Sequence, residues 1–232
     1  MKRTVLYGAF LVGSLSLAAC QQHKESKTSE PDLTGKVAET SQITDCEIKV
    51  GDVTFTKSIN GADTCVTILT DGGLKFSCPE GLDFFCDPNE GKLSNNTLPV
   101  LLIPTDNTKP FTLTAKVTPE FTIEGLYNAA DLFVYVNDTL WQKLAFEQDE
   151  YGNHRIVTVR TQGTSDDNNH DKIDTKSVYM KISSDTRTIA SYYSKKSGIW
   201  CVCIVMNIPI KYISASVASV RNMEDAQASS KI

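Results

Sequence analysis

The segment between residues 127 and 161 constrains the fold most, because apolar and polar residues alternate along three of its runs. The runs are residues 132–136, 141–147 and 156–161, and turn-forming residues separate them. A period of two is typical of β-strands, and short turn-rich gaps are typical of hairpins. The segment therefore predicts a three-stranded antiparallel meander.

The middle run divides its side chains between two faces, because successive side chains of a strand point to opposite sides. One face is mostly apolar and is expected to pack in a core. The other combines an aromatic ring, a cation and an anion, which is typical of a wet binding surface. The first face carries Leu140, Gln142, Leu144 and Phe146, and the second carries Trp141, Lys143, Ala145 and Glu147.

Short runs of the same kind recur from residue 46 to residue 217, with turn signals between them. Two longer gaps, residues 79–99 and the polar segment 162–176, are predicted to be loops. About a dozen short strands are typical of a sandwich or a barrel. We predict an all-β, two-sheet antiparallel jelly-roll sandwich over residues 46–217.

The first 19 residues are predicted to be a signal peptide, since two basic residues precede a mostly apolar run too short to span a bilayer. The run ends in Leu17-Ala18-Ala19-Cys20, which resembles the lipobox of bacterial lipoprotein signal peptides. The resemblance implies cleavage before Cys20 and lipidation of its sulfur. With Gln21 next, it also implies the outer membrane of a Gram-negative-type bacterium.

Polar segments flank the predicted sandwich. Residues 20–45 lack aromatic residues and any apolar period, so we expect a flexible tether, and residues 218–232 are expected to be a polar tail. Removing Lys2 and Arg3 with the signal peptide leaves 21 of the 23 basic residues against 28 acidic residues, a net charge of −7. This excess of acid argues against nucleic acid as a partner.

Several short motifs follow one another in a definite order. They are Asp83-Phe84-Phe85, Tyr127-Asn128-Ala129-Ala130-Asp131, the strand with Trp141, Lys143, Ala145 and Glu147, Ile156-Val157-Thr158, Ser165-Asp166-Asp167, and Tyr193-Ser194 with Trp200. This order resembles a bacterial domain-of-unknown-function family with a concanavalin A-like lectin/glucanase fold, also labelled the regulation-of-enolase family. The resemblance covers residues 56–217 and implies the sandwich, but no assigned activity. Asn128-Ala129 and Asp167 depart from the family's Asp-Gln pair and tryptophan.

The face with Trp141 is the candidate binding surface. Sugars present apolar CH faces and hydroxyls, which suit an aromatic ring beside charged hydrogen-bonding groups. The alternative is a solvated outer face with a cross-strand Lys–Glu pair. The candidate ligand-binding residues are Trp141, Lys143, Glu147, Tyr179 and Arg155.

Glu147 is the candidate catalytic residue, because concanavalin A-like glucanases carry alternating carboxylates and Glu147 and Asp149 share that spacing. Glycoside hydrolysis needs two carboxyl groups about 5–5.5 Å apart for retention, or about 6.5–9.5 Å apart for inversion. However, Asp149 and Glu150 run into the turn at residues 151–153, which favours a solvated hairpin end.

The polar segment 166–174 is the candidate cation site. Asp166, Asp167 and Asp171 offer carboxylate oxygens suited to calcium, although their spacing does not match an EF-hand and a solvated loop is the alternative. No other cofactor is expected. His23, His154 and His170 are isolated from one another and have neither metal nor triad spacing.

Six cysteines follow Cys20, and an even number in an exported chain favours disulfides. Fifteen connectivities exist if all six pair. One option is a staple between Cys78 and Cys86 across the long loop, and a less favoured alternative is a zinc site that adds Cys201 and Cys203. The disulfide candidates are Cys46, Cys65, Cys78, Cys86, Cys201 and Cys203.

Three functions agree with these features. The first is a carbohydrate-binding module of the cell envelope, attached to the membrane through its N-terminal lipid. The second is a glycoside hydrolase that uses Glu147. The third is a non-enzymatic envelope interaction protein with the sandwich as its scaffold. The sequence locates a surface but contains no clean sign of catalysis.

Overall fold

The computed structural model describes residues 40–89, 91–123, 127–196, 198–207, 212–220 and 227–231, which lie in one compact unit, Leu33–Ile232. Its described elements are strands and one short 3-10 helix. They are β1 (Ile43–Val50), β2 (Val53–Ile59), η1 (Ala62–Thr64), β3 (Val66–Ile68), β4 (Leu74–Ser77), β5 (Phe84–Phe85), β6 (Asn95–Asn96), β7 (Val100–Asp106), β8 (Phe111–Pro119), β9 (Ala129–Asn137), β10 (Leu140–Gln148), β11 (His154–Gln162), β12 (Thr164–Lys172), β13 (Val178–Ser184), β14 (Thr188–Ser194), β15 (Cys201–Asn207), β16 (Tyr212–Val220) and β17 (Gln227–Lys231).

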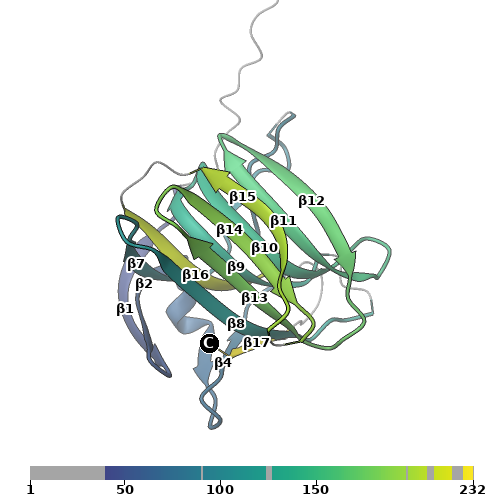
Figure 1. The fold of residues 1–232 in the computed structure, drawn as a ribbon, viewed down its shortest axis with the longest axis horizontal. Coiled ribbons are helices and arrows are strands. Elements are labelled where there is room, and N and C mark those ends of the chain that lie inside the picture. The colour runs from purple at the N-terminus through teal and green to yellow at the C-terminus, as the bar shows by residue number, and fades with distance from the viewer. Residues whose placement is uncertain are drawn as a thin grey trace, which may run out of the picture. The chain divides into compact units, whose positions relative to one another are not determined.

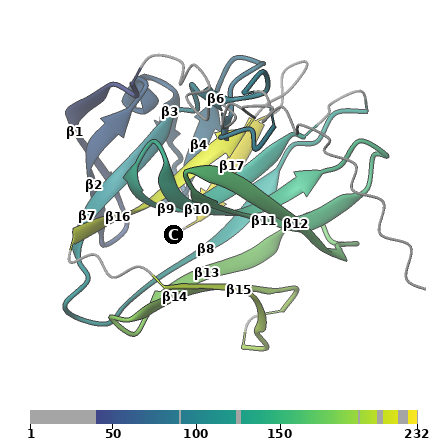
Figure 2. The ribbon, with the colours of Figure 1, turned by 90° about the horizontal axis from the view of Figure 1, so that it is seen from above.

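Two antiparallel sheets lie one on the other as two layers (Figure 1, Figure 2). The eight-stranded sheet has the order β1-β2-β7-β16-β9-β10-β11-β12, and the seven-stranded sheet has the order β15-β14-β13-β8-β17-β4-β3. In the first sheet β9, β10 and β11 are neighbours, which confirms the predicted meander. The predicted all-β, concanavalin A-like jelly-roll sandwich is likewise confirmed.

The main core fills the space between the two sheets. Leu144 and Phe146 of β10 meet Leu113, Ala115 and Val117 of β8 in one buried cluster. These are the residues that alternation places on the inward faces of their strands. Removing a large apolar side chain from water contributes about 1.5–3 kcal/mol, so this cluster is a major source of stability.

A second buried cluster covers part of the outer face, which is the face of the eight-stranded sheet turned away from the seven-stranded sheet. The long loop after β4 folds across this face and inserts Phe84, whose ring lies 5.8 Å from Trp141 and 6.0 Å from Phe133. Trp141 has no exposed surface and donates from Nε1 to the carbonyl of Asp138 at 3.1 Å. The outer face is therefore dry around Trp141. The prediction of a wet surface is wrong at this residue.

Three polar segments predicted to lie outside the strands contribute to the sheets. The segment predicted as the loop 162–176 contains β12, which pairs with β11 along the edge of the eight-stranded sheet. Within the predicted tether, β1 begins at Ile43, and within the predicted tail, β17 pairs with β4 and β8. Backbone hydrogen bonds hold such strands whatever their side chains, and polar residues at the sheet edges, which β1 and β12 form, resist pairing with other chains. The sequences of these segments therefore need little of the apolar alternation on which the prediction depends.

The described cysteines form no disulfide in this structure, but the thiols of Cys65 and Cys78 hydrogen-bond to each other. This bond lowers the pKa of Cys65 to about 6, although burial opposes the shift. Cys86 instead donates to the carbonyl of Asp138 at 3.4 Å, so it is not placed to staple the long loop to Cys78. The side chain of Cys203 lies outside the described residues.

We expect Cys65 and Cys78 to form a disulfide when oxidised glutathione is present, because their thiols are in contact and the lowered pKa supplies the thiolate. The bond would stabilise the fold by about 3 kcal/mol, as is usual for a closed loop of this size. Peptide mapping without reductant should recover the two cysteines in one linked fragment. A fragment that links Cys78 to Cys86 would contradict the prediction.

Candidate functional site

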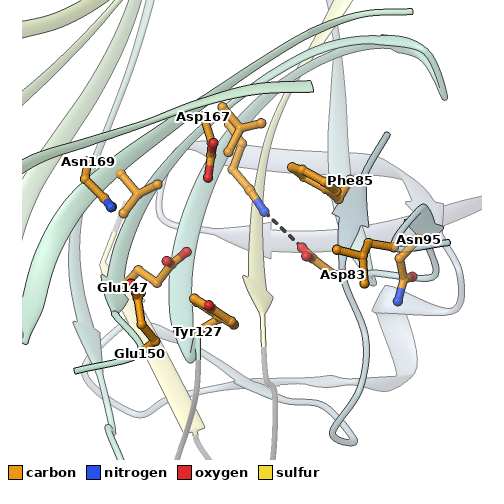
Figure 3. A pocket seen from close by; sticks show the side chains of 12 residues that line it. Asp83, Phe85, Asn95, Tyr127, Glu147, Glu150, Asp167 and Asn169 are labelled. Carbon is orange, nitrogen blue, oxygen red and sulfur yellow. Dashed lines mark hydrogen bonds and ion pairs between the residues drawn. The ribbon is translucent and has the colours of Figure 1, made fainter. Parts of the chain in front are cut away.

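A cavity of about 500 Å³ opens on the outer face. Its walls come from β10, β11 and β12, from the long loop, and from the segment just before β9 (Figure 3). We call it the outer-face cavity. It is lined by Asp83, Phe85, Leu93, Asn95, Tyr127, Lys143, Glu147, Glu150, Val157, Val159, Asp167 and Asn169.

Lys143 stands on the floor of the outer-face cavity and is only 4% exposed. Its Nζ lies 2.9 Å from Oδ1 of Asp83, which reaches over from the long loop, and 3.4 Å from the carbonyl oxygen of Phe84. Burial disfavours the charged amine, but attraction to nearby carboxylates, that of Asp83 first, outweighs burial and raises the pKa of Lys143. The ion pair therefore ties the loop to β10 with its cation charged.

Asp131 of β9 is a buried carboxyl group beside this lysine. It is 1% exposed, and neither of its carboxyl oxygens has a hydrogen-bond partner among the described residues. In the register of the two strands it lies opposite Ala145, so it shares the outer face with Lys143 and Glu147. Burial raises the pKa of Asp131 to about 7, and the charge of Lys143 only partly offsets this. The carboxyl group therefore titrates far above the usual range of an aspartate.

Glu147 points into the outer-face cavity (Figure 3) and is 9% exposed. Its carboxyl group makes no hydrogen bond or ion pair with any described residue. Burial raises its pKa well above the usual value, and Asp131 and Asp83 nearby add to the shift against the opposing charge of Lys143. Glu147 therefore presents a desolvated carboxyl group to whatever enters the cavity.

Tyr127 forms the lower wall of the cavity in Figure 3 and has an unusual backbone conformation. Its φ is +58°, a left-handed backbone conformation that residues other than glycine adopt at an energetic cost. A hydrogen bond of 2.9 Å from its backbone nitrogen to the carbonyl of Gln148 holds the residue in place. Tyr127 as a residue is 42% exposed, and with Phe85 it gives the cavity two aromatic surfaces.

The structure brings two of the five predicted ligand-binding residues, Lys143 and Glu147, together in the cavity. Trp141 lies on the same face but beneath the loop, so its ring supports Phe84 and is closed to a ligand. Arg155 lies opposite Glu147 in the register, but its guanidinium pairs with Asp149 at 2.7 Å and holds the hairpin end. Tyr179 was predicted to share the face of Trp141. It instead belongs to β13 of the other sheet, so this prediction is wrong.

The candidate calcium ligands are spread along β12 and do not form a loop. Asp166 pairs with Arg160 at 3.4 Å, Asp171 accepts a hydrogen bond from Tyr193, and Asp167 alone of the three lines the cavity. Among the described residues no three His, Cys, Asp or Glu side chains are grouped to hold a metal ion.

The two described histidines have structural contacts. His154 stacks on Phe121 with ring centroids 3.9 Å apart, and the ring of His170 hydrogen-bonds to the hydroxyl of Thr158 at 2.7 Å. His23 and the lipidation candidate Cys20 lie outside the described residues. No helix in the described part of the chain has the length and apolar character needed to cross a bilayer.

Several cavity residues were not among the sequence candidates, although the short motifs contain most of the polar ones. Asp83, Phe85 and Tyr127 come from two motifs that are far apart in the chain, and the structure gathers them around Lys143 and Glu147, together with Asp167, which the sequence had marked only as a calcium candidate. Taking every motif position as a candidate would have found them. Asn95 and Asn169 belong to no motif, and we find no sequence signal for either.

The fold and the cavity define a concanavalin A-like sandwich domain with a recessed site on its outer face. Residues 62–218 match the family described as Protein of unknown function (DUF1349), and the chain belongs to this family. The match carries no information on enolase regulation, which stays a prediction. No curated protein matches the chain in sequence.

Solved structures share the fold at low sequence identity. A functionally unknown protein from Saccharomyces cerevisiae is 15% identical with a TM-score of 0.64, over 86% of this chain and 94% of that one. The GH43 protein BlXynB from Bacillus licheniformis is 14% identical with a TM-score of 0.53, over 81% of this chain and 37% of that one. The xyloglucan GH43B protein of Bacteroides ovatus is 15% identical with a TM-score of 0.53, again over 81% of this chain and 37% of that one. The chain thus corresponds to about a third of each GH43 protein.

Proposed function

We propose that this protein is a carbohydrate-binding domain whose ligand occupies the outer-face cavity. The observation that carries the proposal is the lining itself, in which the desolvated Glu147 carboxyl faces the rings of Tyr127 and Phe85 across an open volume of about 500 Å³. Ligand pockets of about 300–1,000 Å³ with a few convergent polar groups are typical of small-molecule sites. The fold shared with parts of GH43 proteins also supports a saccharide.

The chemistry of the cavity walls suits a sugar ring. Tyr127 and Phe85 offer surfaces for the CH faces of a pyranose, while Asn95, Asn169 and the carboxyl groups supply acceptors and donors for hydroxyls. Val157 and Val159 make one part of the floor apolar. A ligand that is apolar on one side and hydroxylated on the other matches this division.

Tyr127→Ala tests the cavity as the binding site. On an immobilised glycan array, the wild-type protein is expected to bind at least one saccharide, and the variant is expected to lose about five- to tenfold in affinity because the lost ring contact is worth about 1–1.5 kcal/mol. Tyr151→Ala is the matched control, since Tyr151 is 80% exposed in a turn outside the cavity. Equal loss in both variants, or no binding by the wild type, would contradict the proposal.

A glycoside hydrolase is the second candidate, and the state of Glu147 favours it. A general acid must be protonated at the working pH, and burial raises the pKa of Glu147 in that direction. Asp83 and Asp167 place further carboxyl groups on the same cavity. Release of new reducing ends from any bound glycan, abolished by Glu147→Gln, would assign hydrolysis; intact glycans leave binding as the function.

We also propose that the domain is attached to the outer membrane of the cell envelope through a lipid on Cys20. The basic start, the short apolar run and the small residues before Cys20 support this. Cys20→Ser is expected to move the protein from the membrane fraction to the soluble fraction of an expressing Gram-negative cell. An unchanged membrane fraction in the variant would contradict lipid attachment.

A further inference from the structure

We propose that the outer-face cavity selects saccharides that carry a free amino group. This inference rests on the proposed carbohydrate binding and names the ligand class of the same site. Two observations carry it: the uncompensated acidic charge of the lining, and the buried Glu147 carboxyl that faces the cavity without a partner.

Acidic groups outnumber basic groups in the lining. Lys143 is the one basic residue among the lining residues, and the ion pair with Asp83 already compensates its charge at 2.9 Å. Glu147, Glu150 and Asp167 line the same volume and form no ion pair with a described residue. A positively charged ligand group is therefore attracted into the cavity, whereas the carboxylate of an acidic sugar meets like charge.

Glu147 provides a specific acceptor for such a group. Its side chain is more than nine-tenths buried, makes no hydrogen bond within the described protein and points into the cavity (Figure 3). A buried acceptor without a donor is costly, and a ligand that supplies the donor removes that cost. An ammonium group offers three donors and a charge, so it stabilises the ionised carboxylate more than a hydroxyl does.

The arrangement suits an organic cation better than a metal ion. No three potential ligands among the described side chains are close enough to share one metal. The carboxyl groups of Glu147, Asp167 and Asp83 instead surround a common space (Figure 3), which Tyr127 and Phe85 border with aromatic rings. A sugar ring with an amino substituent fills such a space, and its ammonium group also gains from an adjacent ring face.

Oligomers of glucosamine and of N-acetylglucosamine test the inference, because they share a backbone and differ in the amino group. By calorimetry at pH 6, we expect the wild-type protein to bind the glucosamine oligomer about tenfold more tightly than the acetylated oligomer of equal length. Glu147→Gln is expected to reduce this preference to about one. Glu120→Gln is the matched control, because it removes one acidic group at an exposed position outside the cavity. This variant should keep the preference for the glucosamine oligomer.

The outcomes separate this inference from the proposed function. Equal affinity for the two oligomers, a preference for the acetylated one, or binding of a galacturonic acid oligomer would overturn the amine selectivity and leave carbohydrate binding in place. An amine preference that persists in Glu147→Gln would overturn the role of that carboxyl group. If neither these oligomers nor any glycan on the array binds, the proposed function itself is wrong.

Discussion

Lys143→Met is expected to lower the free energy of unfolding at pH 7 by about 3 kcal/mol, the lower end of the range for breaking a buried ion pair. The cation sits at 4% exposure with Asp83 at 2.9 Å, and Asp131 and Glu147 share its face of the sheet. Methionine fills a similar volume but leaves these carboxyl groups without their counter-charge. The lower end applies because the Asp83 side chain is 25% exposed, so water partly replaces the lysine.

The loss in Lys143→Met should also depend on pH. Asp131 and Glu147 have raised pKa values in the folded protein, so their contribution to stability is fully present below their unfolded pKa values, about 4, and is lost as pH rises through the folded values. Removing the lysine raises the folded pKa values further. The deficit of the variant is therefore expected to grow from pH 4 to pH 8.

Chemical denaturation of wild type and variant at several pH values measures this effect. Lys195→Met is the matched control, because Lys195 forms an exposed ion pair with Asp174 at 3.1 Å, and exposed pairs are worth about 0–1 kcal/mol. The control's free energy of unfolding should lie within about 1 kcal/mol of the wild-type value. If that of Lys143→Met at pH 7 is equally close to wild type, the ion pair does not hold the loop to the sheet.

Asp131→Asn is expected to stabilise the protein increasingly as pH rises. The wild-type aspartate has a folded pKa of about 7 against an unfolded value near 4, so it contributes stability below about pH 4 and loses that stability as pH rises through 7. At about 1.4 kcal/mol per pKa unit, the loss approaches about 4 kcal/mol. Asparagine has nearly the same shape and does not ionise, so the variant should lack this loss.

The measurable quantity is the stability difference between variant and wild type at pH 4 and at pH 8. Its change should approach about 4 kcal/mol in favour of the variant, whereas its absolute value includes a cost of about 1–3 kcal/mol for an unpaired buried amide. A difference that stays constant over this range would show that Asp131 is ionised in the folded protein throughout.

Asp149→Asn supplies the opposite expectation at another buried aspartate. Burial alone would raise the pKa of Asp149, but hydrogen bonds from Asn153, Tyr151 and Arg155 outweigh it and lower the pKa. This carboxylate stabilises the fold above its unfolded pKa and loses that contribution as pH falls. We therefore expect the asparagine variant to be less stable than wild type at pH 7. The contrast with Asp131 shows that hydrogen bonding, not burial alone, decides the sign.

The sequence predicts the sandwich well because alternation is a local property. Leu144 and Phe146 face the main core as their spacing requires, and β9, β10 and β11 pair in the predicted order. Alternation also separates the face of Lys143 and Glu147 from the core face. It fails at β12 and β17, where backbone pairing builds strands from polar residues.

By itself, the sequence determined the class of fold, the central meander and the face that carries Lys143 and Glu147. Only the tertiary structure decided what covers that face. Alternation gives two sides to a strand, but the fate of each side depends on contacts between residues far apart in the chain. Phe84 of the long loop buries Trp141 and removes it from the site, while Asp83 beside it pairs with Lys143 and leaves Glu147 open to a ligand.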